Sequence, residues 1–294
     1  MEKKKVKKPL SLFGKIRRVI GVFLVVIILG ILGILAFGAL DAYGLQNPQG
    51  LYTNRFRSSW GEHGAYVAIP PGNHGPGTLP GVVMIHEWWG LDRETIAKAD
   101  LLAAQGFLVV VPDALLGRKA QTVPGAILLS LATPSLAIDQ AIDGAFEYTA
   151  NHPLTDPEQI GIMGFCFGGR EAMQFGQRDA RPSALITLYG SNLETEDPGL
   201  LGANGPVLGI FGAEDRMIPL AQVDQFHELL LDAGVDVTIT IYEGVGHAFV
   251  KTSEIDQPGP AREAWLQVTE FLSLHLKQER GIPGVMALGE PHVQ

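Results

Sequence analysis

Cysteine is almost absent from this chain of 294 residues, which contains only one, Cys166. A single thiol excludes an intrachain disulfide framework and any zinc site built from several cysteines. It also excludes an intramolecular redox pair, so packing and nucleophilic attack are the uses that remain for it. His86 and Glu87 lack a second ligand at helical or strand spacing, and the glycine-rich segment Gly164–Gly169 lacks the lysine of a P-loop. We therefore expect neither a metal nor a cofactor.

Basic residues are scarce beyond the N-terminus. Residues 1–18 hold eight of the 22 lysines and arginines and one of the 31 acidic residues, so the rest of the chain carries 14 basic and 30 acidic side chains. Binding of a phosphate backbone needs a basic face. The acidic remainder therefore argues against nucleic acid as a partner, and the short basic segment needs another explanation.

Charge is missing altogether from residues 19–40, which are rich in Ile, Leu and Val. A helix of this length spans about 30 Å, the thickness of the hydrocarbon core of a bilayer. We predict a single transmembrane helix, with segment 1–18 in the cytoplasm and the rest of the chain outside it by the positive-inside rule. The alternative is a cleaved signal peptide and a secreted protein. The apolar region of a signal peptide is about 7–15 residues long, which is shorter than this run.

The remainder divides into a linker at 41–57, a single domain at 58–280 and a tail at 281–294. Within the domain, apolar runs of strand length alternate with segments of helical periodicity. This alternation predicts an α/β fold, with a mostly parallel sheet and helices on both faces. We expect strands at 65–69, 82–85, 107–111, 160–163, 184–188, 207–211 and 237–242, and helices at 93–105, 135–150, 222–233 and 262–276.

The lone cysteine lies in the motif Gly164-Phe165-Cys166-Phe167-Gly168-Gly169, directly after the strand expected at 160–163. A strand that ends in Gly-x-nucleophile-x-Gly is the nucleophile elbow of α/β-hydrolases. Glycines at the flanking positions permit the tight turn, and the helix that follows favours a thiolate through its N-terminal partial charge. The alternative is a buried, inert cysteine. The glycines and the preceding strand favour a nucleophile.

An acid and a histidine follow the cysteine in the order that this fold uses. Asp215 comes after the strand expected at 207–211, and His247 after the one at 237–242. We predict that His247 takes the proton of the thiol and that Asp215 orients the imidazole and stabilises its charge. Glu214 is a competing acid, but Asp215 lies further into the loop and matches the expected position better.

These motifs together resemble the dienelactone hydrolase family, cysteine-dependent members of the α/β-hydrolase superfamily. The similarity covers about residues 60–276. Its other motifs are His86-Glu87-Trp88-Trp89-Gly90-Leu91, the segment 99–107 leading to Pro112-Asp113, Asp215 before Pro219, and Gly246-His247-Ala248-Phe249. The resemblance implies an α/β-hydrolase fold and hydrolysis of a small-molecule ester or lactone through a thioester acyl-enzyme.

The resemblance also implies roles for four residues near the nucleophile. Glu87 corresponds to a glutamate that contacts the nucleophile and helps to convert thiol to thiolate when substrate binds. On the alternative interpretation, Glu87 merely ends a strand. The backbone N–H groups of Phe167 and Trp88 correspond to an oxyanion hole. The side chain of Trp89 is expected to line the substrate pocket.

The chain departs from the family where dienelactone-cleaving members use arginines to bind a substrate carboxylate. Lys251 occupies one such position and lacks the bidentate fork of arginine. The segment 114–134 has no convincing counterpart of the other arginine. Its part 126–132 is apolar enough to line a more hydrophobic pocket. The reaction type is therefore expected to carry over better than the substrate.

Two other functions are compatible with the same residues. A hydrolase fold can serve as a non-catalytic binding or interaction module, which the altered carboxylate site would suit. A lone thiol on a tight turn can also act as a redox sensor, by way of a sulfenic acid.

Overall fold

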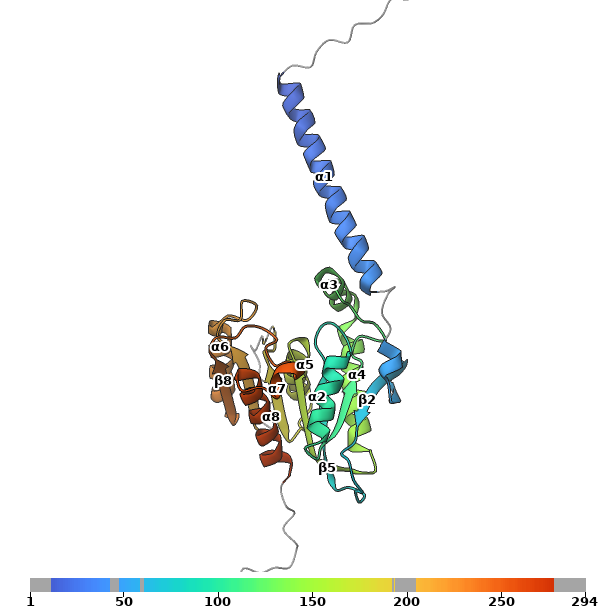
Figure 1. Cartoon of the computed structure of the whole chain (residues 1–294), viewed down its shortest axis with the longest axis vertical. Coiled ribbons are helices and arrows are strands. Elements are labelled where there is room, and N and C mark those ends of the chain that lie inside the picture. The colour runs from blue at the N-terminus through green and yellow to red at the C-terminus, as the bar shows by residue number, and fades with distance from the viewer. Residues whose placement is uncertain (1–11, 43–47, 59–60, 192, 194–204, 278–294) are drawn as a thin grey trace, which may run out of the picture.

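In the computed structural model, eight strands form one sheet in the order β1-β2-β4-β3-β5-β6-β7-β8 (Figure 1). The structure describes residues 12–277 except 43–47, 59–60, 192 and 194–204, so the tail and the first eleven residues lie outside the described part. The strands are β1 (Asn54–Ser58), β2 (Gly61–Ala68), β3 (Leu79–Ile85), β4 (Leu108–Pro112), β5 (Thr155–Phe165), β6 (Ala184–Leu188), β7 (Val207–Gly212) and β8 (Val237–Tyr242).

The sheet is parallel from β4 to β8, and the two antiparallel pairs are β1 with β2 and β2 with β4. Every residue of β3, β4, β6 and β7 is buried. Burial on both faces explains why these strands are continuous apolar runs in the sequence rather than alternating ones. The predicted mostly parallel α/β-hydrolase sheet is therefore confirmed.

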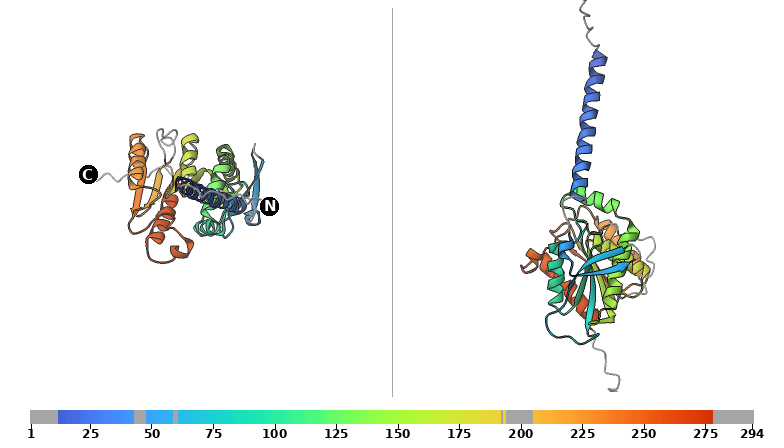
Figure 2. Two further views of the ribbon diagram at one scale, coloured as in Figure 1. Left: turned by 90° about the horizontal axis from the view of Figure 1, so that it is seen from above. Right: turned by 90° about the vertical axis from the view of Figure 1, so that its right-hand side faces the viewer.

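Helices cover both faces of this sheet, as the views in Figure 2 show. One face carries α2 (Arg93–Ala103) and α8 (Pro260–Leu276), and the other carries α4 (Ser135–Ala150), α5 (Phe167–Arg178) and α6 (Leu220–Asp232). The side chain of Asp92 fixes the start of α2, because it accepts a hydrogen bond from the amide of Thr95 (2.9 Å). The remaining elements are the helices α1 (Leu12–Leu40) and α3 (Val123–Ala132) and two short helical turns, η2 (Pro48–Leu51) and α7 (Thr252–Ile255).

The segment expected as a linker at 41–57 is partly built into the domain, so this boundary was wrong. Residues Asn54–Ser58 form β1 and pair with β2 from Asn54 opposite Ala65 to Ser58 opposite Gly61. The ring of Phe56 stacks on that of His63, with centroids 5.6 Å apart. This edge strand is five residues long, with an arginine on each side of Phe56, so it lacks the apolar run that marked the inner strands.

The N-terminal helix α1 (Leu12–Leu40) projects from one end of the domain (Figure 1). Its most apolar stretch of 18 residues, within Lys15–Leu40, has a mean hydropathy of 3.2 and is not buried in the protein, so the helix is apolar and long enough to cross a membrane. An N-terminal signal sequence has the same properties.

The foot of α1 packs on α3 (Val123–Ala132), a helix that the sequence marked only as an apolar run. A Cβ at Gly38 would lie 3.0 Å from atoms of Pro124 and Leu128. Just beyond α1, the buried carboxylate of Asp41 accepts hydrogen bonds from the amides of Gln121 (2.9 Å) and Thr122 (2.8 Å). Burial raises the pKa of Asp41, but these bonds outweigh it and hold the pKa below its ordinary value. The helix and the domain are therefore joined by specific contacts.

Candidate active site

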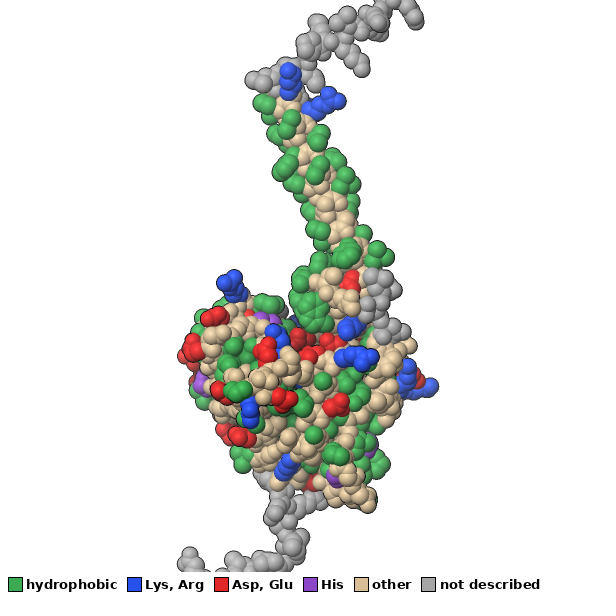
Figure 3. Space-filling view, in the orientation of Figure 1, with side chains coloured by type: hydrophobic (Ala, Val, Ile, Leu, Met, Phe, Trp, Pro, Cys, Tyr) green, Lys and Arg blue, Asp and Glu red, His purple; other side chains and the backbone are tan. Residues whose placement is uncertain are grey.

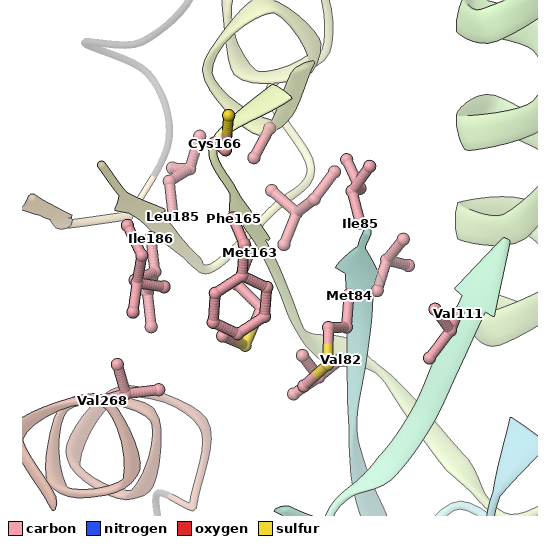
Figure 4. Packing of buried hydrophobic residues seen from close by; sticks show 14 of the residues in the cluster. Val82, Met84, Ile85, Val111, Met163, Phe165, Cys166, Leu185, Ile186 and Val268 are labelled. Atoms are coloured by element: carbon pink, nitrogen blue, oxygen red, sulfur yellow. The ribbon is translucent and has the colours of Figure 1, made fainter. Parts of the chain in front are cut away.

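A tight turn after β5 places Cys166 above the carboxyl edge of the sheet, at the start of α5 (Figure 4). A Cβ at position 164 would lie 2.1 Å from the backbone of Gly168, and a Cβ at 168 would lie 2.3 Å from the carbonyl oxygen of Ile85. Both positions therefore require glycine. The strand, turn and helix expected around Cys166 are all present.

The backbone of Cys166 is strained and is held by four hydrogen bonds. Its φ of 53° and ψ of −111° lie in a region that costs a non-glycine residue about 1–3 kcal/mol. The amide of Cys166 donates to the carbonyl of Leu188 (2.9 Å). Its own carbonyl accepts from the amides of Gly169 (3.1 Å), Arg170 (3.2 Å) and Ser191 (3.3 Å). These bonds offset the strain and fix the direction of the side chain.

Asp215 and His247 lie on loops that leave β7 and β8 at the same edge. Asp215 Oδ2 and His247 Nδ1 are 2.7 Å apart. The other carboxylate oxygen accepts from the amides of Met217 (2.8 Å) and Ile218 (3.1 Å), so the carboxylate is held in place to orient the imidazole. The buried Nε2 of His247 has no hydrogen-bond partner among the described residues. It is therefore the ring atom open to proton transfer.

Tyr189 also belongs to this edge, although the sequence analysis did not select it. It directly follows β6, at a φ of 40°, and is fully buried. Its ring packs edge-on against the imidazole of His247, with centroids 5.3 Å apart and the planes 63° apart. The position itself was the available signal, because the residue after a parallel strand lies at the carboxyl edge.

His86 fixes the loop that carries Glu87. Its Nε2 accepts a hydrogen bond from the amide of Ala114 (3.1 Å), so its Nδ1 carries the proton and donates to the carbonyl of Glu87 (2.7 Å). Burial lowers the pKa of His86, which agrees with a neutral ring. His86 thus ties the loops after β3 and β4 together and is a structural rather than a reacting group.

The environment of Cys166 opposes its ionisation. Burial, and after it the negative charge of Glu87, raise the pKa of the thiol to about 12. The N–H of Phe167 donates to the sulfur and acts in the opposite direction, as does the charge of Arg170. The thiol is therefore neutral around pH 7 until the charge of Glu87 is moved or neutralised.

Glu87 has a buried cation beside it that the sequence analysis missed. Burial raises the pKa of Glu87, and the positive charge of Lys98 opposes that rise. The side chain of Lys98 is 3% exposed, with Nζ 3.5 Å from a carboxylate oxygen of Glu94 and 4.3 Å from the ring centroid of Phe165. The sequence of α2 predicts an amphipathic helix, and nothing in that pattern indicates that Lys98 points into the protein.

A pocket of about 270 Å³ opens beside Glu87. Trp89 and Lys251 line it, together with Asp92, Glu94, Thr95, Lys98, Ala248, Val250 and Ser253. Trp88 packs its ring edge-on against Trp89, with centroids 5.2 Å apart. The apolar segment 126–132 is not among the residues that line this pocket. It belongs to α3 instead.

Replacing Glu87 by glutamine should lower the pKa of the Cys166 thiol. The glutamine keeps the shape of the side chain but removes the charge that opposes the thiolate. Alkylation by iodoacetamide, followed against pH, should therefore reach half its maximal rate at a lower pH than in the parent protein. Glu94→Gln is the matched control, since Glu94 lines the same pocket and bonds to Thr252. An unchanged or higher midpoint in Glu87→Gln would contradict the assigned influence of Glu87.

Comparison with known proteins gives one consistent result. The model of the dienelactone hydrolase family matches residues 64–276. A protein of Aquifex aeolicus, provisionally named a carboxymethylenebutenolidase, is 29% identical over 212 residues, which cover 67% of this chain and 89% of that protein. The protein Usf of Aquifex pyrophilus is 27% identical, over 67% of this chain and 89% of its own length.

Solved structures show the same fold. A Klebsiella pneumoniae protein provisionally named a dienelactone hydrolase has a TM-score of 0.66 at 23% identity, covering 75% of this chain and 96% of its own. A dienelactone hydrolase-like promiscuous phosphotriesterase from metagenomic libraries has a TM-score of 0.65 at 18% identity, with the same coverage.

Proposed function

Because the chain belongs to the dienelactone hydrolase family, a family of hydrolases, we propose that it cleaves carboxylic esters or lactones with Cys166 as the nucleophile. The observation that carries this proposal is the hydrogen bond of 2.7 Å between His247 and Asp215, at the edge where the elbow presents Cys166. It leaves Nε2 of a correctly oriented imidazole free to take a proton.

The reaction proceeds in two halves. Nε2 of His247 takes the thiol proton as the sulfur of Cys166 attacks the carbonyl carbon, and the amides of Phe167 and Trp88 receive the negative charge of the tetrahedral intermediate. The intermediate collapses to a thioester while the leaving alkoxide accepts the proton from His247. Water, deprotonated by His247, then attacks the thioester, releases the acid and restores the thiol.

Glu87 provides control over the first half. Its charge opposes the thiolate in the free protein, so the thiol stays protonated and unreactive. Lys98 and Lys251, both in the same pocket, are cations toward which the carboxylate of Glu87 can turn when substrate enters. Movement away from the sulfur lowers the pKa of the thiol at the moment when the carbonyl is in place.

The charges of the pocket favour a neutral substrate. Three carboxylates line it, those of Glu87, Asp92 and Glu94, against the two cations of Lys98 and Lys251. Lys251 is also 3.4 Å from Glu254, so part of its charge is already engaged. A carboxylate on the substrate would therefore meet a pocket without net positive charge.

The contacts at the foot of α1 support a retained membrane anchor rather than a cleaved signal. Gly38 fits closely against Pro124 and Leu128, and Asp41 bonds to Gln121 and Thr122. A segment removed after export would have no use for such a fit. With residues 1–18 held in the cytoplasm by their charge, the hydrolase domain lies on the opposite side of the membrane.

Trapping the acyl-enzyme tests the proposed reaction. The full chain in detergent, mixed with p-nitrophenyl acetate and quenched in acid within the first turnover, should gain the mass of one acetyl group, and peptide mapping should place it on Cys166. His247→Ala should release p-nitrophenol far more slowly, because proton transfer contributes about 10²–10⁴-fold. Turnover without any acylated Cys166 would exclude the thioester route.

A further inference from the structure

The helix α3 presents an apolar face that nothing in the described part of the protein covers. Val123, Ile127 and Leu131 are exposed and lie four residues apart, so they form one stripe along the helix. Leu131 is 80% exposed. No charged residue occurs between Lys119 and Asp139. In Figure 3, hydrophobic side chains gather on α3 at the foot of α1.

The depth of α3 relative to a membrane follows from the length of α1. Arg17 and Arg18 are the last charges before the apolar run and mark its cytoplasmic boundary. A hydrocarbon core of about 30 Å takes about 20 helical residues. Counted from Arg18, the opposite boundary falls at about Gly38, the residue that packs on Pro124 and Leu128 of α3. The helix α3 therefore lies at the surface of the bilayer.

The catalytic edge lies on the same side as α3. The loop that leads into α3 leaves the carboxyl end of β4, which lies beside β3, the strand before Glu87; β3 in turn lies beside β5, the strand before Cys166. The amide of Ala120 donates to the carbonyl of Trp89 (2.9 Å), which ties that loop to the pocket. The side chain of Asp41 then holds the end of α1 to Gln121 and Thr122. The anchor, α3 and the pocket thus follow one another through direct contacts.

From these observations we infer that α3 is an interfacial helix that seats the catalytic edge on the bilayer, and that esters dissolved in the bilayer are the substrates of the site. The substrate part of this inference rests on the proposed hydrolase function and anchor. The apolar side chains of an interfacial helix lie in the boundary between headgroups and acyl chains, with the helix in the plane of the membrane. Leu136, which follows the bend after α3, is also exposed and extends the same apolar surface.

Lipid quenching tests the seat without any need for activity. The full chain with Cys166→Ser and Leu131→Cys, labelled with the fluorophore NBD, is reconstituted into phosphatidylcholine vesicles. Its fluorescence should be lost when the vesicles contain lipids with a doxyl group near the headgroup. The control is Leu274→Cys, on a residue 69% exposed near the end of α8 that lies far from α1 (Figure 1), and it should keep its fluorescence. A label at 131 that is shielded but not quenched would indicate a second copy of this chain and overturn the proposal.

Two further readouts separate the seat from the anchor and from the chemistry. Leu131→Glu should lower the rate on p-nitrophenyl palmitate held in vesicles about tenfold, because a buried leucine is worth about that much in binding, and should leave the rate on soluble p-nitrophenyl acetate unchanged. Equal effects on both esters would overturn the proposed substrate class.

Vesicle flotation reports the anchor alone. If the chain floats with the vesicles but the label at 131 is not quenched, the anchor is supported and the interfacial position of α3 is contradicted. If the chain does not float, both are contradicted. A chain that is quenched but inactive on both esters refutes only the hydrolase.

Discussion

Replacing Cys166 by alanine is expected to lower kcat/KM for p-nitrophenyl acetate by about four orders of magnitude or more. The elbow places the sulfur of Cys166 where it can attack a carbonyl carbon. Among the described residues at this edge, we assign no other side chain as a nucleophile beside the His247–Asp215 pair. Removal of a nucleophile that acts as a unit with its base costs about as much as removal of the whole unit, which leaves only the contribution of binding and the oxyanion hole. The measurement is steady-state hydrolysis by the full chain in detergent.

The same variant separates the hydrolase from its alternatives. The melting temperature of Cys166→Ala checks that the variant still folds. We expect it to be close to that of the parent protein, because the substitution removes only the thiol of a residue that is 4% exposed. A binding module would keep its ligand in this variant and would show no hydrolysis in the parent protein. A redox sensor would form one sulfenic acid at Cys166 under mild peroxide and would also show no hydrolysis.

Replacing Gly164 by alanine is expected to destabilise the protein by about 3–5 kcal/mol, and to abolish activity in whatever folds. The new Cβ would lie 2.1 Å from both the carbonyl carbon and the oxygen of Gly168. Overpacking of this kind usually costs about 1–3 kcal/mol, and backbone atoms cannot rotate away as a side chain would. Denaturant unfolding followed by tryptophan fluorescence measures the change.

Gly50→Ala is the matched control for this substitution. Nothing lies within 4 Å of a Cβ at position 50, and its backbone has no positive φ. We expect it to change the free energy of unfolding by less than about 0.5 kcal/mol. Equal stability of the two variants would mean that the turn at Cys166 is looser than the described geometry.

The inner part of the sheet, and the meeting of Asp215 and His247 at one edge of it, could be predicted because local sequence determines them. Buried parallel strands must be continuous apolar runs, and a turn as tight as that at 164–168 admits only glycine at its flanks. Asp215 follows the buried strand β7 and His247 follows the parallel edge strand β8, so their place at one edge follows from the topology of the sheet.

The elements that were missed depend on contacts between distant segments. The edge strand β1 is held by pairing with β2 and by the ring of Phe56 on His63, neither of which its five residues reveal. Lys98 is buried because its Nζ lies over the ring of Phe165, which the distant strand β5 supplies, beside Glu94 on its own helix. Likewise, α3 begins where Thr122 caps it and Asp41 bonds to it across 81 residues of sequence.

Four hydrogen bonds hold the main chain of Cys166, the N–H of Phe167 donates to its side chain, and the glycines that shape the turn are neighbours rather than the residue itself. The scaffold is therefore indifferent to which side chain stands at position 166, provided that it is small. Serine would occupy the same place without rebuilding the loop. A single substitution could therefore exchange sulfur for oxygen at this position. Selection between cysteine and serine here would act on the reactivity of the side chain and not on folding.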